Sequence, residues 1–191
     1  TGRYSILVDW PANLRDDYDD PNVMGNANAR DTVGSTVNTM IQGFYYGMLR
    51  TAERLAGIAD APGLKRSLEG RADRVRASAL LKLRNSETGC FVDRPGADHS
   101  ALHANVTPLV SGMVPSSEAG PLLALLKQKR ISCGVYFSWF LLKALYDYGE
   151  ADQAYELMTS SDTHSWHAML EAGATTCMEA WAPDLKWNTS W

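Results

Sequence analysis

The residues best suited to chemistry lie near the two ends of the 191-residue chain. Near the C-terminal end, Glu179 stands two positions before Trp181 and follows a run of small residues, 173–176. Near the other end, Asp9 and an adjacent aromatic residue precede an acidic stretch, 15–20. An indole can carry the apolar face of a pyranose ring while a carboxylate acts on the glycosidic bond or on water. Two separated acidic sites with aromatic neighbours indicate a glycosidase.

The composition limits the kind of protein and its partners. A chain of this length is long enough for one domain with a core and short for two. Its residues are 45% hydrophobic and 21% charged, which is ordinary for a soluble globular protein. The net charge of −4 gives no electrostatic reason to expect nucleic acid or an anionic membrane surface as a partner. No apolar run approaches the roughly 20 residues that span a bilayer.

The cysteines and histidines do not form a recognisable metal or redox site. Cys90, Cys133 and Cys177 are odd in number and widely spaced, which argues against a disulfide framework and against zinc. We interpret them as small buried residues. Three isolated histidines are interpreted as hydrogen-bonded structural residues: His103, His164 and His167. We therefore expect no metal and no cofactor.

The chain between the two acidic sites has a helical pattern. Apolar residues recur at helical spacing over about 33–59, and a break at 60–63 separates them from a second helix at about 64–83. The basic residues of this second helix indicate a solvated face. A turn-rich loop spans 85–100. Shorter helices are then predicted over 101–111, 117–129, 134–148, 151–157 and 165–172, with Trp139, Phe137, Phe140 and Leu141 expected in the core. Residues 4–8 fit a short strand or an extended lead-in, and the fold class is all-α.

The predicted helices pair by length, which is typical of αα-hairpins. Such hairpins build either an open solenoid or a closed barrel. A solenoid would show a fixed sequence period, and none is present. A closed barrel of hairpins is therefore favoured, and only a closed fold would bring Asp16 and Glu179 together across 163 positions.

Four motifs follow one another in the order of a known family. They are Asp9-Trp10-Pro11 with Arg15-Asp16, then Leu102-His103-Ala104-Asn105, then 136–145 with Gly149, and last the Gly-Ala-Thr-Thr-x-x-Glu-x-Trp run of 173–181. By these motifs the chain resembles the catalytic domain of bacterial α-L-rhamnosidases, which are six-hairpin (α/α)6-barrel glycosidases. The first motif departs from the usual family form, Asp-Cys-Pro followed by an arginine, an acidic pair and Gly-Trp. The resemblance implies that residues 1–191 are a single domain, part of a catalytic barrel truncated at both ends.

The resemblance also implies roles for individual residues. The family's enzymes invert the anomeric centre, with Asp16 in the place of the general acid and Glu179 in that of the general base. Asp9 is expected to bind sugar hydroxyls, and Arg15 to bind a hydroxyl or pair with an acid. Asp17 is a further substrate-binding candidate and an alternative acid.

Trp181 is the remaining candidate for substrate binding. Two roles are open for it: stacking on the sugar or shaping the pocket, and packing in the core with a partner for its N–H. The acidic stretch 15–20 also has other interpretations, as a loop of turn-forming aspartates or as an oxygen-ligand site for calcium.

Alternatives to an α-L-rhamnosidase remain open from the sequence. One is another six-hairpin glycosidase or lyase with a different sugar. Another is a non-catalytic helical interaction module, which predicts that Asp16 and Glu179 lie far apart. The expected partners are a carbohydrate substrate and the remainder of a parent chain. A partial barrel should be inactive alone and should self-associate through exposed apolar helix faces. An exported bacterial parent enzyme would fit the family's context.

Overall fold

The computed structural model describes residues 8–10, 14–18 and 37–185. These residues form helices and connecting loops and contain no strand, only one isolated antiparallel bridge between Arg84 and Phe91. The α-helices are α1 (Thr39–Ile58), α2 (Pro62–Lys82), α3 (Leu102–Val110), α4 (Gly120–Lys129), α5 (Val135–Asp147), α6 (Ala151–Thr159) and α7 (Trp166–Glu171), with short 3-10 turns η2 (Ser116–Glu118) and η3 (Pro183–Leu185). The predicted all-α class is confirmed, and of the residues 4–8 only Val8 lies within the described part.

Local chemistry explains where the helices begin and end. Asn38 caps α1, because its side chain accepts a hydrogen bond from the backbone N–H of Ile41 at 3.2 Å. The predicted break at 60–63 is a tight turn, and Pro62 begins α2, where the first turn needs no backbone donor from it. Gly149 follows α5 with a φ of 82°, the left-handed conformation that ends helices.

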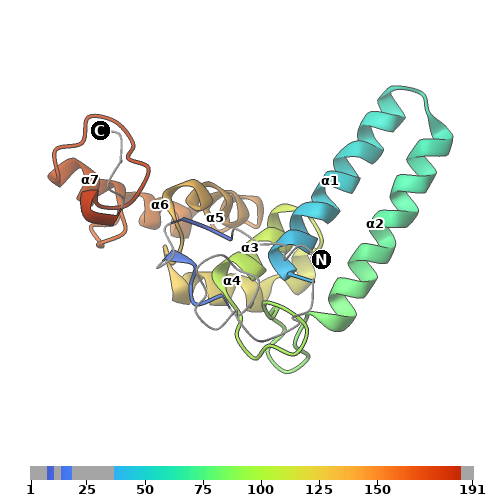
Figure 1. Ribbon diagram of the computed structural model, residues 1–191, viewed down its shortest axis with the longest axis horizontal. Helices are drawn as coiled ribbons and strands as arrows, with labels where there is room; N and C mark the ends of the chain where they lie inside the picture. The colour runs from blue at the N-terminus through green and yellow to red at the C-terminus, as the bar shows by residue number, and fades with distance from the viewer. Residues whose placement is uncertain (1–7, 11–13, 19–36, 186–191) are drawn as a thin grey trace, which may run out of the picture.

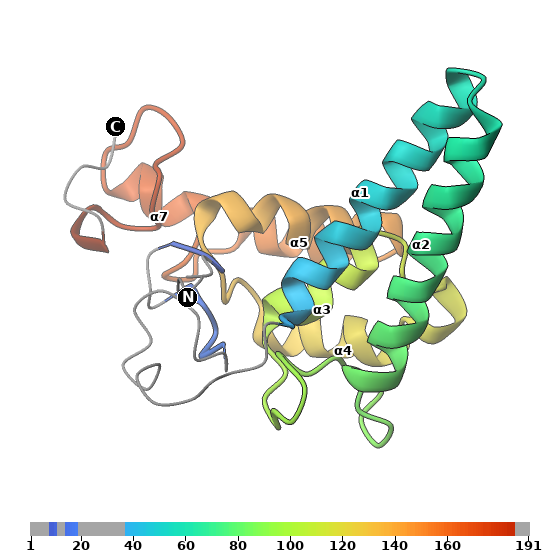
Figure 2. The same cartoon turned by 45° about the vertical axis from the view of Figure 1, so that its right-hand side comes forward.

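The helices form three consecutive αα-hairpins, α1–α2, α3–α4 and α5–α6 (Figure 1). Within this series the odd-numbered helices pack on one another, α1 on α3 and α3 on α5. Each even-numbered helix packs on the partner of its own hairpin. This alternation of contacts is the one expected of a barrel of hairpins. Figure 2 shows the long α1–α2 hairpin extending away from the shorter helices.

Helix α3 is the centre of the core. Its residues from Leu102 to Leu109 are all buried, although three of them are polar. Asn105 satisfies its amide through the backbone N–H and C=O of Phe91, at 2.8 Å and 3.0 Å. Helix α1 approaches α3 closely at Gly43, where an added Cβ would lie 2.5 Å from Thr107 Oγ1. The polar side chains of α3 therefore fix how the neighbouring segments dock on it.

Two predictions of burial are wrong. Trp139 has 59% of its surface exposed, because it lies on the outward face of α5 with Tyr136. Its ring packs at a steep angle against that of Phe140, at 4.8 Å between centroids. Cys177 is exposed in the loop after α7, whereas Cys90 and Cys133 are buried as expected. None of the helices in the described ranges has the length and apolar content needed to cross a bilayer.

Candidate functional site

Asp9 connects the N-terminal motif to two helices of the core. Its Oδ2 accepts hydrogen bonds from the backbone N–H of Gly134, at 2.6 Å, and from Nε2 of His103, at 2.8 Å. Its Oδ1 accepts from the N–H of Trp10 at 2.8 Å. The side chain is almost fully buried, so it holds this motif against the starts of α3 and α5. Its predicted contact with sugar hydroxyls stays a prediction.

Arg15 is also buried and reinforces the same connection. Its Nε donates to the backbone carbonyl of Asp9 at 2.9 Å. Burial lowers the pKa of Arg15, and the Asp9 carboxylate partly offsets this effect. The role expected for Arg15, binding a hydroxyl group or pairing with an acid, stays a prediction.

Asp16 lies at the N-terminus of α3. Its Oδ2 accepts a hydrogen bond from the backbone N–H of Leu102 at 2.6 Å and pairs with Nζ of Lys129 at 2.8 Å. The first turn of a helix carries unpaired N–H groups and a partial positive charge, so an anionic side chain is stabilised there. Because both donors use Oδ2, a proton on this carboxyl group would sit on Oδ1.

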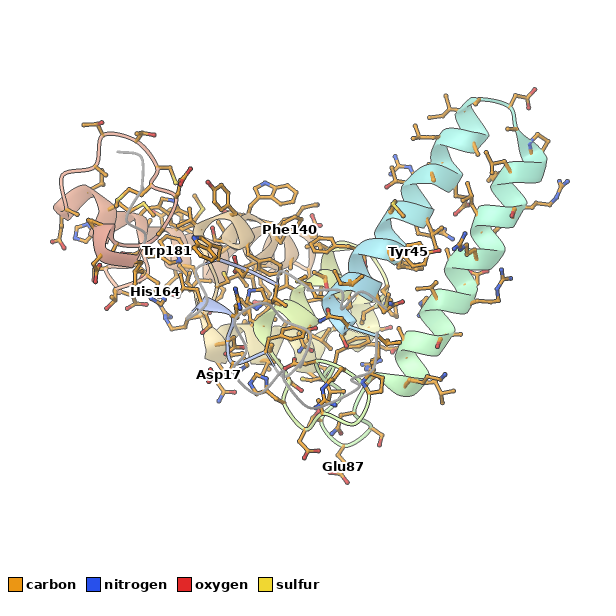
Figure 3. The ribbon with its side chains drawn as sticks, viewed as in Figure 1. Asp17, Tyr45, Glu87, Phe140, His164 and Trp181 are labelled. Atoms are coloured by element: carbon orange, nitrogen blue, oxygen red, sulfur yellow. The ribbon has the colours of Figure 1, made fainter. Side chains whose placement is uncertain are left out.

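The backbone conformation at Asp16 and Asp17 directs these adjacent residues into different surroundings. Both have left-handed φ values, 51° and 49°, which are uncommon for residues other than glycine, although Asp tolerates them. This turn leaves Asp16 partly buried and Asp17, which Figure 3 labels, exposed. The two adjacent acids therefore have different environments. Asp19 and Asp20, which belong to the same acidic stretch, lie outside the described residues.

A short segment between α4 and α5 receives contacts from both predicted motifs. In this segment, residues 129–134, Lys129 pairs with Asp16 and Gly134 binds Asp9. The carbonyl of Cys133 accepts a hydrogen bond from Nε1 of Trp181 at 2.7 Å. Burial raises the pKa of the Cys133 thiol, and Asp9 and Asp16 raise it further. The thiol is therefore neutral, and the segment brings the N-terminal and C-terminal motifs together.

Trp181 packs in the core. Only 1% of its surface is exposed, and its ring lies 5.0 Å from that of Trp166, edge to face, and 6.4 Å from that of His164, stacked. This arrangement matches the second of the two roles expected for Trp181, a core residue whose N–H has a partner. No face of the indole is open for a sugar to stack on.

Glu179 is held close to this core without being fully buried. It is partly exposed and lies between the buried residues Met178 and Ala180. Two residues of chain span at most about 7 Å, so the backbone of Glu179 lies within that distance of Trp181. The anchoring of Trp181 on Cys133 thus places Glu179 near the segment 129–134. Its separation from Asp16 stays a prediction of roughly 6.5–9.5 Å, as inversion requires.

A second Asp–His pair adjoins Asp16, and the sequence did not reveal it. Asp93 is fully buried; its Oδ2 lies 2.7 Å from Nδ1 of His99, and its Oδ1 accepts from the N–H of Ala101 at 2.7 Å. The hydrogen bond to Asp93 raises the pKa of His99. The negative charge of Asp16 raises this pKa as well, and the positive charge of Lys129 lowers it. The Asp16–Lys129 ion pair therefore affects the protonation of His99.

An open hollow of about 520 Å³ lies beside the segment 129–134. One wall is formed by residues 129–132, at the end of α4, and the other by residues 161–164, in the loop between α6 and α7. Lys129 belongs to the first wall and also pairs with Asp16. His164 belongs to the second wall and stacks on Trp181. The hollow therefore lies between residues that contact the two motifs.

Comparison with known protein families gives a match over nearly the whole chain. A family model described as the bacterial alpha-L-rhamnosidase 6 hairpin glycosidase domain matches residues 5–191. No curated protein sequence matches at a significant level.

Two solved structures are similar in fold. The α-L-rhamnosidase from Dictyoglumus thermophilum has a TM-score of 0.63 and 20% identity over 73% of this chain and 16% of that one. The Streptomyces avermitilis α-L-rhamnosidase, solved in complex with L-rhamnose, has a TM-score of 0.61 and 23% identity over 80% of this chain and 15% of that one. The chain thus spans about a sixth of the length of either enzyme. With 187 of its residues matched by the family model, in an all-helical series of hairpins, the chain belongs to the bacterial α-L-rhamnosidase six-hairpin glycosidase domain family.

Proposed function

We propose that this domain supplies the catalytic carboxyl groups of an inverting glycosidase that hydrolyses terminal α-L-rhamnosides. Asp16 is the general acid and Glu179 the general base. The observation that carries the proposal is the segment 129–134, which contacts Asp16 directly and holds Trp181, two residues from Glu179. The carboxyl group of Asp16 thus contacts this segment, and Glu179 lies two positions from a residue that contacts it.

The contacts of Asp16 stabilise the carboxylate that it becomes after it donates its proton to the leaving oxygen. The neutral carboxyl group carries its proton on Oδ1 and transfers it to the glycosidic oxygen as the bond to the anomeric carbon breaks. Asp16 is then a carboxylate, and the N–H of Leu102 and the ammonium group of Lys129 stabilise its negative charge. Both donors are in place before the reaction, so no reorganisation is needed when the charge develops.

Glu179 completes the reaction on the opposite side of the sugar ring. As a carboxylate it removes a proton from a water molecule, whose oxygen attacks the anomeric carbon and inverts its configuration. Hydrolysis leaves Asp16 ionised and Glu179 protonated, and exchange with solvent restores both groups. The partial exposure of Glu179 is compatible with access of this water.

The proposal is tested by substitution in the protein that carries this domain. Asp16→Asn and Glu179→Gln should each lower kcat for an α-L-rhamnoside by about 100-fold or more, because each removes an acid–base group. Proton NMR of the first product should show the β-anomer, as inversion requires. Release of the α-anomer, or near-wild-type kcat in either variant, would contradict the mechanism.

Asp17→Gly is the matched comparison for Asp16→Asn. Glycine adopts the left-handed φ of 49° without strain, so the turn should keep its shape while the neighbouring carboxylate is lost. If Asp16 is the acid, Asp17→Gly should lose much less activity than Asp16→Asn. The reverse order would make Asp17 the acid. A panel of α- and β-linked glycosides of other sugars, run with the unmodified protein, would identify a different sugar specificity.

A further inference from the structure

The backbone just after α4 has a conformation that its residue disfavours. Helix α4 ends at Lys129, and the next residue, Arg130, has a φ of 52° and a ψ of −135°. Positive φ values are uncommon for residues that carry a Cβ atom, and this combination belongs to turns in which glycine predominates. Such a conformation persists only where the surrounding structure holds the residue in it.

The side chain of Arg130 provides that hold. Its guanidinium group donates to both carboxylate oxygens of Glu156, on α6, at 3.1 Å and 2.7 Å. Its Nε donates to Asp162, in the loop after α6, at 2.8 Å. The backbone N–H of the same residue donates to the carbonyl of Leu126, on α4, at 3.0 Å. Arg130 is therefore fixed to α4 through its backbone and to α6 through its side chain, and two-point contact also fixes the orientation of the guanidinium plane.

The ion pairs of Arg130 are a weak reason for this backbone if fold stability is their only effect. The side chains of Arg130, Glu156 and Asp162 have exposed fractions of 38%, 50% and 55%. Exposed ion pairs contribute little to the free energy of unfolding, because water and salt screen them. The effect of this conformation on the neighbouring residues is the stronger reason.

The residues on either side of Arg130 contact the N-terminal motif at two points. Before it, Nζ of Lys129 pairs with Asp16 at 2.8 Å, and this pair is more shielded than those of Arg130. After it, the N–H of Gly134 donates to Asp9 at 2.6 Å. A change of φ at Arg130 would rotate the chain on one side of it relative to the other. The two contacts could then not both be kept.

We infer that Arg130 is a positioning residue for the proposed general acid: its ion pairs hold the turn that places Lys129 on Asp16. The inference rests on the proposed function for the role of Asp16. Arg130 acts through Lys129, whose charge stabilises the carboxylate formed when the acid gives up its proton. Its side-chain contacts thus maintain a conformation that glycine would adopt by its own backbone freedom.

Two substitutions remove the same ion pairs and differ only in the backbone. Arg130→Gly and Arg130→Ala both delete the guanidinium group, but only glycine adopts the φ of 52° without strain. In Arg130→Ala the turn should relax and withdraw Lys129 from Asp16. In the protein that carries this domain, kcat for an α-L-rhamnoside should then fall about tenfold, the effect of losing one hydrogen bond to a charged group.

The pattern of the kinetic constants separates positioning from a general loss of structure. In Arg130→Ala, KM should stay close to that of the unmodified protein, because Lys129 stabilises a charge that develops only in the transition state. Arg130→Gly should keep most of the activity, although it lacks the same ion pairs. Equal kcat values for the two variants would overturn the inference.

A second measurement follows Lys129 directly in the 191-residue chain. Acetylation by an N-hydroxysuccinimide ester, read by mass spectrometry, reports how accessible each amine is. Lys129 should be acetylated faster in Arg130→Ala than in Arg130→Gly or the unmodified chain. Lys127, which pairs with Glu150 from the same helix, is the internal reference and should react equally in all three.

The acetylation also distinguishes this inference from the proposed function. If Asp16→Asn keeps its activity, the proposed function fails, yet faster acetylation of Lys129 in Arg130→Ala would still support its placement by Arg130. Equal acetylation of Lys129 in the Gly and Ala variants would overturn that placement whatever the activity of Asp16→Asn.

Discussion

Two carboxylates accept hydrogen bonds from adjacent backbone N–H groups at the N-terminus of α3. One of them belongs to Asp16, the proposed acid. Asp93 accepts from the N–H of Ala101 at 2.7 Å, and Asp16 from the next N–H, that of Leu102, at 2.6 Å. Like charges held at one helix end repel each other, so each acid has a cationic partner. Lys129 pairs with Asp16, and His99 with Asp93. The protonation of His99 is therefore part of the charge balance at the site.

The pKa of His99 is expected to lie above the ordinary value of about 6.5, chiefly because Asp93 binds its Nδ1. Charged His99 then stabilises the folded chain fully below about pH 6.5, and this contribution is lost as the pH rises through the pKa of the folded state. Asp16 and Lys129 act on the same imidazole in opposite directions. NMR titration of the His99 ring should show a lower pKa in Asp93→Asn. Asp98→Asn is the neighbouring control, and equal His99 titration curves for Asp93→Asn and the unmodified chain would refute the role of Asp93.

Sequence reasoning reached only part of this arrangement. Asp9, Arg15, Asp16 and Glu179 were found because motifs in the family's order surround them. Lys129, Asp93 and His99 were not, since a lysine at a helix end and two residues of a turn-rich loop carry no periodic signal. Their meeting is set by the docking of α3 and α4, which local patterns do not encode. The burial of Trp181 was undecided for the same reason.

At the scale of elements, the start of α5 is positioned by a residue more than a hundred positions away. The N–H of Gly134 donates to Asp9 at 2.6 Å. The φ of Gly134 is −68°, so glycine is not required there for backbone reasons. It is required by space: an added Cβ would lie 2.5 Å from Oδ1 of Asp9 and would also clash with the carbonyl oxygen of Trp10. A side chain at this position would push the N-terminal motif away from α5.

Gly134→Ala should therefore destabilise the chain by about 1–3 kcal/mol, the usual cost of overpacking. The matched control is Gly63→Ala in the first turn of α2, where an added Cβ would meet nothing within 4 Å. That change should be neutral or stabilising, because alanine favours helix more than glycine does. Urea unfolding of the three proteins measures both effects. Equal midpoints for Gly134→Ala and the unmodified chain would show that Asp9 does not hold this helix.

The hairpin order of these elements was predictable, because helix lengths and turn residues mark each pair. The pattern predicted helices over about 33–59 and 64–83 and the shorter ones after residue 100. Helix α1 begins only at Thr39, about six residues after its predicted start, and the other described helices lie within about three residues of their predicted bounds. What the pattern could not supply was the direction of each apolar face. Helical periodicity is the same whether a face packs inside its own chain or remains exposed, as Trp139 on α5 illustrates.

At the scale of the whole molecule, the α1–α2 hairpin presents apolar side chains to solvent. Ile41, Met48 and Leu55 follow one another at spacings of seven residues along α1, with exposed fractions of 41%, 59% and 60%. Residues at this spacing lie on one helix face. Figure 3 shows this hairpin standing apart from the helices that carry the site. A contiguous apolar stripe of this kind is typical of a surface that packs against protein.

The 191-residue chain is therefore expected to self-associate through α1. Met48→Lys/Leu55→Lys should shift it toward the monomer, because the two charges would be buried in any contact on this face. Ala77→Lys/Ser78→Lys, at exposed positions of α2, adds the same charge elsewhere and should leave the association unchanged. Analytical ultracentrifugation over a range of concentrations measures both. If the unmodified chain remains monomeric at high concentration, the prediction is wrong.

The segment 129–134 also limits how sequences of this kind can change in length. Its contacts fall at three fixed positions: Lys129 with Asp16, Cys133 with Trp181, and Gly134 with Asp9. Inserting or deleting one residue within it would move at least one of these groups by about 3.5 Å, beyond hydrogen-bond reach of its partner. Length variation among relatives should therefore collect in connections that hold no such contacts, such as the turn between α1 and α2, while this segment keeps a constant number of residues.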